Sequence, residues 1–361
     1  MPRSVRVIVL ALAAAWLVAG CAAAYTYLHR YDVYRGFPTP TTPAGIPRGT
    51  VLTRNFYSPA VHQSTGTDIY LPPHYAAQAA AGRRFPVLYL MHGWPGHAKV
   101  FVDAGAIAVD ANVMIAHHQM PPMILVMPGG KESGQGDTEW ANTSSGQWMS
   151  YVLDVVHAVD HHYKTFADRQ HRGLAGLSEG GYGAINIALR HLKMFSVAES
   201  WSGYFTQTPT GPYAHATATQ LRAASPAAYL PVVAPRVHRL GLRAWLIQGR
   251  EDTTNPALIQ NFAAALHAAG GAVHYGFYPG GHDWALWRRQ LPHMLTVAGR
   301  WFGERPAASH GFSHVGSHLT LKQLAKIKRM RQQHCLHRHI GPHSKVGLGC
   351  RLLRKAHHLP T

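Results

Sequence analysis

The sequence predicts an α/β fold, with a mostly parallel central sheet and helices on both faces. Continuous apolar runs at residues 85–91 and 122–127 are typical of strands that are buried on both sides. Segments with helical spacing at residues 106–118 and 149–162 alternate with them, as a parallel sheet requires. With 361 residues, of which 47% are apolar, the chain can form one large catalytic domain with appendages.

The N-terminal segment is apolar and long enough to cross a membrane. Two arginines precede 22 uncharged residues at 7–28. A signal peptide with its apolar region at residues 7–19 is an alternative, and the residues that end at Cys21 also resemble a bacterial lipobox. Each interpretation of residues 1–30 places the following domain outside the cytoplasmic membrane, in a bacterial cell envelope or secreted.

A proline-rich stretch at residues 31–48 predicts an extended linker, and the catalytic domain is expected at residues 49–305. The strands expected in this domain are 49–56, 67–71, 85–91, 122–127, 172–175, 195–201, 244–248 and 272–278, the first two antiparallel. The helices expected are 106–118, 149–162, 182–192 and 291–302. Residues 204–235 interrupt this alternation with five prolines. We expect a long loop there that forms a wall of the substrate pocket, or else a surface insertion.

The C-terminal segment is strongly basic. Residues 306–361 carry ten Lys/Arg and no Asp or Glu, in a chain whose formal net charge is +18. We expect either a disordered, solvated tail or an electrostatic arm that binds a membrane or an anionic envelope polymer. Within it, residues 319–340 could form a helix that is only weakly amphipathic. We expect no nucleic-acid partner.

The cysteine and histidine patterns predict no metal and no cofactor. The three cysteines, Cys21, Cys335 and Cys350, lie outside the central region, which excludes a core built on disulfides or on a cysteine metal site. The 27 histidines are scattered through loops and the tail, and the chain contains no H-E-x-x-H or P-loop pattern.

A G-x-S-x-G motif places Ser178 between Gly176 and Gly180. A short strand precedes it and a helical run follows it, which is the context of a nucleophile elbow. On such a turn the serine backbone is strained, so its neighbours two residues away must have almost no side chain. The motif alone leaves open a small residue in a glycine-rich loop.

The order of further residues favours nucleophilic catalysis. A serine hydroxyl needs a base to take its proton, and the base needs an acid to orient it. Asp252 and His282 follow two later predicted strands, in the order Ser, Asp, His that a doubly wound hydrolase requires. Glu251 is the alternative acid, and Asp283 is expected to be structural.

An oxyanion hole requires two backbone N–H groups directed at the developing negative charge. We expect one from Glu179, directly after the nucleophile, and the other from Trp94 in the HGWPG loop. Because only its N–H is needed, the Glu179 carboxylate should point away, towards a basic group.

The chain resembles the putative-esterase branch of the α/β-hydrolases, which includes feruloyl and acetyl xylan esterases, S-formylglutathione hydrolase and the antigen 85 mycolyltransferases. The resemblance covers roughly residues 49–303. It is carried by FYSPAV, DIYLPPHY, FPVLYLMHGWPG, PPMILVMPGG, GLSEGGYGAINIALRH, SWSGY, the G-x-x-D that ends at Asp252, and GGHDWALW. It implies an α/β-hydrolase fold and triad roles for Ser178, Asp252 and His282. Glu179 departs from the methionine that is common in these esterases.

The expected activity is that of a serine esterase acting on a small-molecule or polysaccharide-linked ester. An acyltransferase of the envelope would use the same triad with another alcohol in place of water. A non-catalytic binding protein on a hydrolase fold is the alternative from another class.

Overall fold

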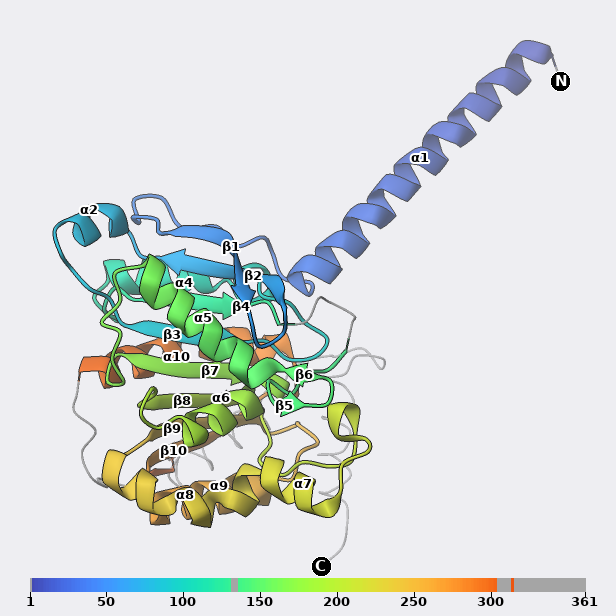
Figure 1. Ribbon diagram of the computed structural model, residues 1–361. Helices are drawn as coiled ribbons and strands as arrows, with labels where there is room; N and C mark the ends of the chain where they lie inside the picture. The colour runs from blue at the N-terminus through green and yellow to red at the C-terminus, as the bar shows by residue number, and fades with distance from the viewer. Residues whose placement is uncertain (1, 131–135, 304–312, 315–361) are drawn as a thin grey trace, which may run out of the picture. The chain divides into compact units, whose positions relative to one another are not determined.

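The computed structural model describes residues 2–130, 136–303 and 313–314, and within them a 9-stranded sheet forms the centre of the fold (Figure 1). The strand order is β1-β2-β4-β3-β7-β8-β9-β10-β11. The strands are β1 (Thr50–Ser58), β2 (Gln63–Leu71), β3 (Val87–Met91), β4 (Ile124–Pro128), β7 (Arg172–Leu177), β8 (Val197–Trp201), β9 (Arg243–Gly249), β10 (Ala272–Tyr278) and β11 (Ser313–His314).

The directions of the strands bring several loops to one edge of the sheet. β1 pairs with β2, and β2 with β4, in antiparallel register, whereas the pairs from β4 to β11 are parallel. The carboxyl ends of β3, β7, β8, β9 and β10 therefore share an edge, where open α/β sheets bind ligands. The predicted fold class and its antiparallel opening strands are confirmed.

Two layers of helices cover the sheet. Side chains alternate across each strand, so Tyr89 and Met91 of β3 join one core cluster while Leu88 and Leu90 join the other. The first cluster includes buried residues of α5 (Trp148–His162), α6 (Glu179–Arg190), α8 (Pro226–Leu240) and α9 (Pro256–Ala268). The second includes those of α3 (Val100–Asp103), α4 (Ile107–Ala116) and α10 (Trp284–Gly303). Strands that are apolar on both sides are thus buried on both sides.

The expectation of a long loop at residues 204–235 is wrong. The segment contains a 3₁₀ turn (Gly211–Tyr213), α7 (Ala218–Ala224) and most of α8. Pro226 stands in the first turn of α8, where a missing N–H breaks no helical hydrogen bond. Pro231 and Pro235 lie inside α8 on its exposed side, while Leu230, Val233 and Val237 are buried. The prolines suggested a loop, although the spacing of the buried residues is that of a helix.

Other elements were not expected from the sequence. They are α2 (Tyr75–Ala80), α3, α9 and the small hairpin β5 (Asn142–Thr143) and β6 (Gly146–Gln147). Helix α10 begins at Trp284, seven residues before the predicted start at 291, and Pro292 lies inside it. The Asp283 carboxylate stabilises its first turn by accepting a 2.9 Å hydrogen bond from the N–H of Leu286. The remaining predicted strands and helices lie where they were expected, with ends that differ by a few residues.

The N-terminal run is one helix, α1 (Arg3–Tyr34). Its segment 8–34 contains an 18-residue window with a mean hydropathy of 2.1 and is long and apolar enough to cross a membrane, a property that a signal sequence shares. In the basic tail, Ser313 and His314 pair with β10. The predicted helix at 319–340 and the two C-terminal cysteines lie outside the described residues.

Candidate active site

Ser178 stands on a sharp turn between β7 and α6. Its φ of 55° and ψ of −120° are rare for a residue with a side chain. A Cβ on Gly176 would lie 2.4 Å from the Gly180 carbonyl group, and one on Gly180 would lie 2.0 Å from the Met91 carbonyl oxygen. The turn therefore requires both glycines, as the sequence predicts for a nucleophile elbow.

The structure brings Ser178, His282 and Asp252 together. His282 Nε2 lies 2.8 Å from Ser178 Oγ, and His282 Nδ1 lies 2.8 Å from Asp252 Oδ2. These residues come from the loops after β7, β9 and β10, which the parallel register places at one edge. One imidazole thus contacts the hydroxyl and the carboxylate at hydrogen-bond distance.

The carboxylate of Asp252 is held in its ionised form. Its side chain is only 1% exposed. Burial by itself would raise the pKa of Asp252, but hydrogen bonds from the Thr254 N–H and from His282 outweigh it, and the pKa lies below its usual value. A negative charge at this place favours the imidazolium that forms when His282 takes a proton.

The other acidic residues of the two loops have structural contacts. The Glu251 carboxylate accepts a hydrogen bond from the N–H of Gly280 and so ties the loop after β9 to the loop after β10. The Asp283 carboxylate accepts a hydrogen bond from the N–H of Leu286 in the first turn of α10. The hydrogen bond to His282 is made by Asp252, the first choice from the sequence, and not by Glu251.

The HGWPG loop lies against the nucleophile. A Cβ on Gly93 would be 3.0 Å from Ser178 Cβ, so the loop backbone touches the serine directly. The described part of the chain shows no hydrogen bond from the backbone N–H of either Trp94 or Glu179. Two unused amides that flank Ser178 are what an oxyanion site needs. Their role there stays a prediction.

Trp140 and His92 hold the HGWPG loop in place by hydrogen bonds. Trp140 Nε1 donates to the His92 carbonyl oxygen at 2.9 Å, and the two rings pack edge to face. His92 Nε2 lies 2.9 Å from the Gly129 carbonyl oxygen at the end of β4. Burial lowers the pKa of His92, although its backbone hydrogen bonds oppose this, so the ring is neutral at pH 7. The loop beside Ser178 is therefore tied to β4.

The side chain of Glu179 differs from the expectation. It is buried, 4% exposed, and forms no ion pair with any basic group in the described part of the chain. Its Oε1 accepts hydrogen bonds from the Thr138 N–H at 3.0 Å and the Thr138 hydroxyl at 2.6 Å. Burial, together with the negative charges of Asp137 and Glu139, raises the pKa of Glu179 to about 8. A neutral carboxyl group therefore replaces the expected ion pair, because burial disfavours the charge.

Glu139 belongs to the same acidic cluster. Burial raises its pKa to about 7, against hydrogen bonds from the Tyr204 hydroxyl at 2.5 Å and from Gln207 Nε2 at 3.0 Å. Tyr204 in turn stacks on Tyr182 of α6, with ring centroids 5.6 Å apart. The sequence did not predict these contacts. Tyr204 ends the SWSGY motif, to which no role was given, and residues 137–139 and 205–207 belong to no motif.

Trp287 of α10 is a second residue whose place the sequence analysis missed. Its ring packs edge to face on His282 with centroids 5.2 Å apart, and its Nε1 donates to Ser202 Oγ at 3.1 Å. Ser202, directly after β8, has a φ of 52°. Trp287 was quoted within the GGHDWALW motif, but without a role.

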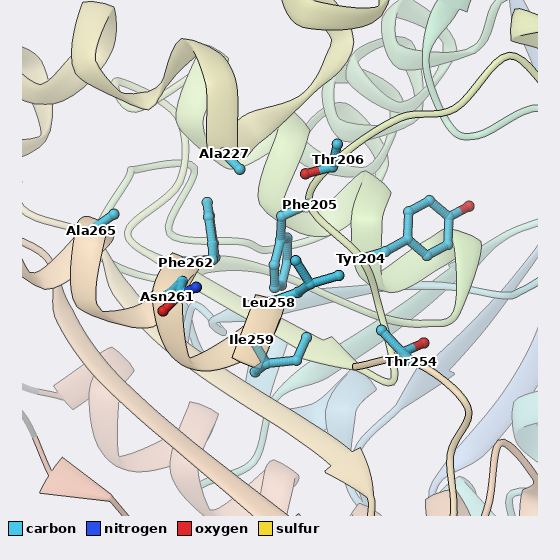
Figure 2. Close-up of a pocket in the computed structure, with 10 residues that line it drawn as sticks. All are labelled: Tyr204, Phe205, Thr206, Ala227, Thr254, Leu258, Ile259, Asn261, Phe262 and Ala265. Carbon is cyan, nitrogen blue, oxygen red and sulfur yellow. The ribbon is translucent and has the colours of Figure 1, made fainter. Parts of the chain in front are cut away.

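An apolar cavity of about 300 Å³ lies between the segment after β8 and α9 (Figure 2). Its lining residues are Tyr204, Phe205, Thr206, Ala227, Thr254, Leu258, Ile259, Asn261, Phe262 and Ala265. Phe205 and Phe262 stack with ring centroids 3.9 Å apart, while the ring of Tyr204 is directed away from them. No triad member lines the cavity, so a substrate pocket walled by residues 204–235 stays a prediction. Among the described residues, no cluster of three His, Cys, Asp or Glu side chains could hold a metal ion.

Comparison with protein families gives a match along most of the catalytic domain. The family described as putative esterase matches residues 58–297. The chain belongs to this family. The matched range contains Ser178, Asp252 and His282 and every strand from β2 to β10.

Relatives and solved structures agree with the family. An endo-1,4-beta-xylanase/feruloyl esterase of Xylanibacter ruminicola is 26% identical over 255 residues, which are 69% of this chain but 31% of that protein. An esterase of Mycobacterium tuberculosis is 28% identical over 152 residues, 41% of this chain and 31% of its own length. The chain thus spans about a third of these two proteins.

Two solved structures show the same fold. A ferulic acid esterase superposes with a TM-score of 0.62 at 23% identity, over 70% of this chain and 99% of its own. The S-formylglutathione hydrolase of Staphylococcus aureus superposes with a TM-score of 0.58 at 18% identity, over 69% and 98%. The predicted α/β-hydrolase fold is confirmed.

The tight packing of the nucleophile elbow predicts that adding one methyl group at Gly180 destabilises the fold. Gly180→Ala should lower the free energy of unfolding by at least about 2 kcal/mol, because the new Cβ would collide with the Met91 carbonyl oxygen in a backbone that cannot yield. Urea unfolding measures the change. Gly303→Ala, with open space around its Cβ, is the control and should change stability little. Equal stability of both variants would contradict the packing described.

The raised pKa of Glu179 leads us to expect a loss of activity at alkaline pH. An acid whose pKa is raised to about 8 is neutral below that pH and becomes negative above it, which opposes the neighbouring oxyanion. The kcat/KM for an aryl acetate should therefore fall severalfold between pH 7 and pH 9. Glu179→Gln keeps an acceptor for Thr138 and should remove this fall.

The control for this pH profile is Asp110→Asn in α4, a carboxyl group whose pKa is also raised by burial, to about 6. It should leave the fall between pH 7 and pH 9 in place. If Glu179→Gln retained the wild-type profile, ionisation of Glu179 would not be its cause.

Proposed function

We propose that the protein is a serine esterase, which hydrolyses carboxylic esters through an acyl-enzyme on Ser178. The observation that carries the proposal is the single imidazole of His282, 2.8 Å from the Ser178 hydroxyl and 2.8 Å from the Asp252 carboxylate. Membership of the putative esterase family supports the reaction class.

The geometry supports a two-step reaction. Ser178 Oγ attacks the carbonyl carbon of the ester while its proton moves to His282 Nε2. The C–O bond to the alcohol then breaks, and His282 returns this proton to the leaving oxygen. In the second step His282 takes a proton from water, which attacks the acyl carbon, and Ser178 regains its proton as the acid leaves.

Asp252 and the two loop amides act on the charges that develop. The ionised Asp252 fixes the ring of His282 with its Nδ1 proton facing the carboxylate and stabilises the imidazolium. The N–H groups of Trp94 and Glu179 stabilise the oxyanion. The Glu179 carboxyl group is neutral at pH 7, so it adds no opposing charge beside them.

The substrate class that we propose is an ester linked to a polysaccharide. The xylanase/feruloyl esterase relative and the ferulic acid esterase structure support it by their names. We also propose that α1 places the enzyme outside the cytoplasmic membrane, since its segment 8–34 is long and apolar enough to cross one.

The triad predicts a ranking of variants. Ser178→Ala should abolish hydrolysis of an aryl acetate, and an organophosphonate should label Ser178 alone. Asp252→Asn should lower kcat by about four orders of magnitude, since the orienting charge on His282 is lost. Glu251→Gln, one residue away and bound to the Gly280 N–H, is the matched control and should cost far less. The reverse ranking would move the role of the acid to Glu251.

The location of the anchor predicts how truncated chains behave. A chain that begins after residue 47 should be soluble and should retain wild-type kcat/KM, because the triad lies wholly beyond α1. The full chain should fractionate with membranes. Cys21→Ser then separates the alternatives: a membrane-bound, unprocessed product supports a spanning helix, and loss of membrane attachment supports a lipidated Cys21.

A further inference from the structure

A polar cavity of about 490 Å³ lies beside the HGWPG loop, on the face of β1 and β2 that is next to α3. Its walls come from the β1–β2 pair, from the segment His97–Lys99 and from Gly129 and Gly130 after β4. The triad mechanism uses none of these residues. Of the lining side chains, only that of Ala98 is purely hydrocarbon.

The cavity adjoins the nucleophile through one loop. Gly93 of this loop touches Ser178, and His97, four residues later, lines the cavity. From the other side, His92 holds the Gly129 carbonyl oxygen in the cavity wall. Trp94, 56% exposed, stands on the loop between the two places. One short loop therefore links the nucleophile to the cavity wall.

Asp68 is the chemical centre of the cavity. It is 4% exposed, and its Oδ1 accepts a 2.5 Å hydrogen bond from the Thr53 hydroxyl. Across the described ranges, neither a hydrogen bond to Oδ2 nor an ion pair with Asp68 is found. Because Asp68 lines the cavity and a carboxylate oxygen accepts strong hydrogen bonds from hydroxyl groups, a ligand hydroxyl would be bound well at this atom.

Three further polar side chains of the cavity also lack a hydrogen-bond partner among the described residues. The side chains of Asn55, Gln63 and Ser64 are exposed and show no hydrogen bond within the described part of the chain. Burial lowers the pKa of His97, so its ring is neutral at pH 7 and offers one donor and one acceptor. Lys99 adds donors. Mixed donors and acceptors fit a ligand whose every hydroxyl both donates and accepts.

We propose that this cavity binds the alcohol part of the ester, and that this part is a sugar residue held by Asp68. The proposal rests on the proposed esterase function and names its substrate class from this chain's own residues. It assigns Asp68, Asn55 and Lys99 to substrate selection rather than to bond breaking. The acyl part lies elsewhere, since Ala98 supplies the only purely hydrocarbon side chain of the lining.

The test compares two esters of the same acid. The kcat/KM is measured for acetylated xylotriose and for 4-nitrophenyl acetate, and their ratio is the selectivity for the sugar. Asp68→Asn keeps the Oδ1 acceptor for Thr53 and replaces only the oxygen that lacks a donor. It should lower the ratio about tenfold, as the loss of a charge-assisted hydrogen bond does.

The matched control is Arg54→Ala on the same strand. Arg54 is exposed, and the alternation of β1 places it on the opposite face from Thr53 and Asn55. This variant should leave the ratio within about twofold of wild type, whereas Asn55→Ala should lower it. An unchanged ratio in Asp68→Asn, or an equal fall in Arg54→Ala, would overturn the proposal.

A binding measurement separates this proposal from the esterase function. The Ser178→Ala variant is titrated with xylotriose and with maltotriose, neither of which carries an ester. The titrations are then repeated with the double variant that also carries Asp68→Asn. At least one sugar should bind, about tenfold more weakly after the second substitution. Binding of neither, or binding that Asp68→Asn leaves unchanged, rejects the sugar site. Wild-type protein that hydrolyses neither ester, but binds a sugar through Asp68, rejects the esterase function alone.

Discussion

The close approach of three backbone segments around Ser178 is the constraint on which the site depends. The carbonyl oxygen of Met91 at the end of β3 lies where a side chain on Gly180 would have to be, and Gly93 touches the serine from above. A serine with a φ of 55° is held there by this packing, and the strain is balanced by the buried strands around it. The nucleophile, the loop of the oxyanion site and the start of α6 thus form one unit, and none of them can shift alone.

Two carboxyl groups near this unit are given different charge states by their surroundings. Asp252 has donors on both oxygens, from Thr254 and His282, and stays ionised in spite of its burial. Glu179 receives donors on one oxygen only and faces other acids, so it keeps its proton at pH 7. The negative charge therefore lies behind the base, where it helps, and not beside the oxyanion site.

Much of the site could be predicted because its signals are local. Gly176, Ser178 and Gly180 form one motif, and Asp252 and His282 each follow a strand that is visible as an apolar run. The surroundings of Glu179 could not be predicted, since Thr138 lies 41 residues away and no periodicity links the two. Helix α8 could not be predicted because Pro231 and Pro235 interrupt the helical sequence pattern, although both lie on its exposed side and leave its packing intact.

The loops that carry the acid and the base are fastened to each other more firmly than to the serine. The Arg250 N–H bonds to the Tyr278 carbonyl oxygen, the Glu251 N–H bonds to the Gly280 carbonyl oxygen, and the Glu251 carboxylate holds the Gly280 N–H in return. His282 reaches Ser178 by one hydrogen bond only. We therefore expect the imidazole and the carboxylate to move together when this edge of the sheet fluctuates. On warming, the base should separate from its nucleophile before it separates from its acid.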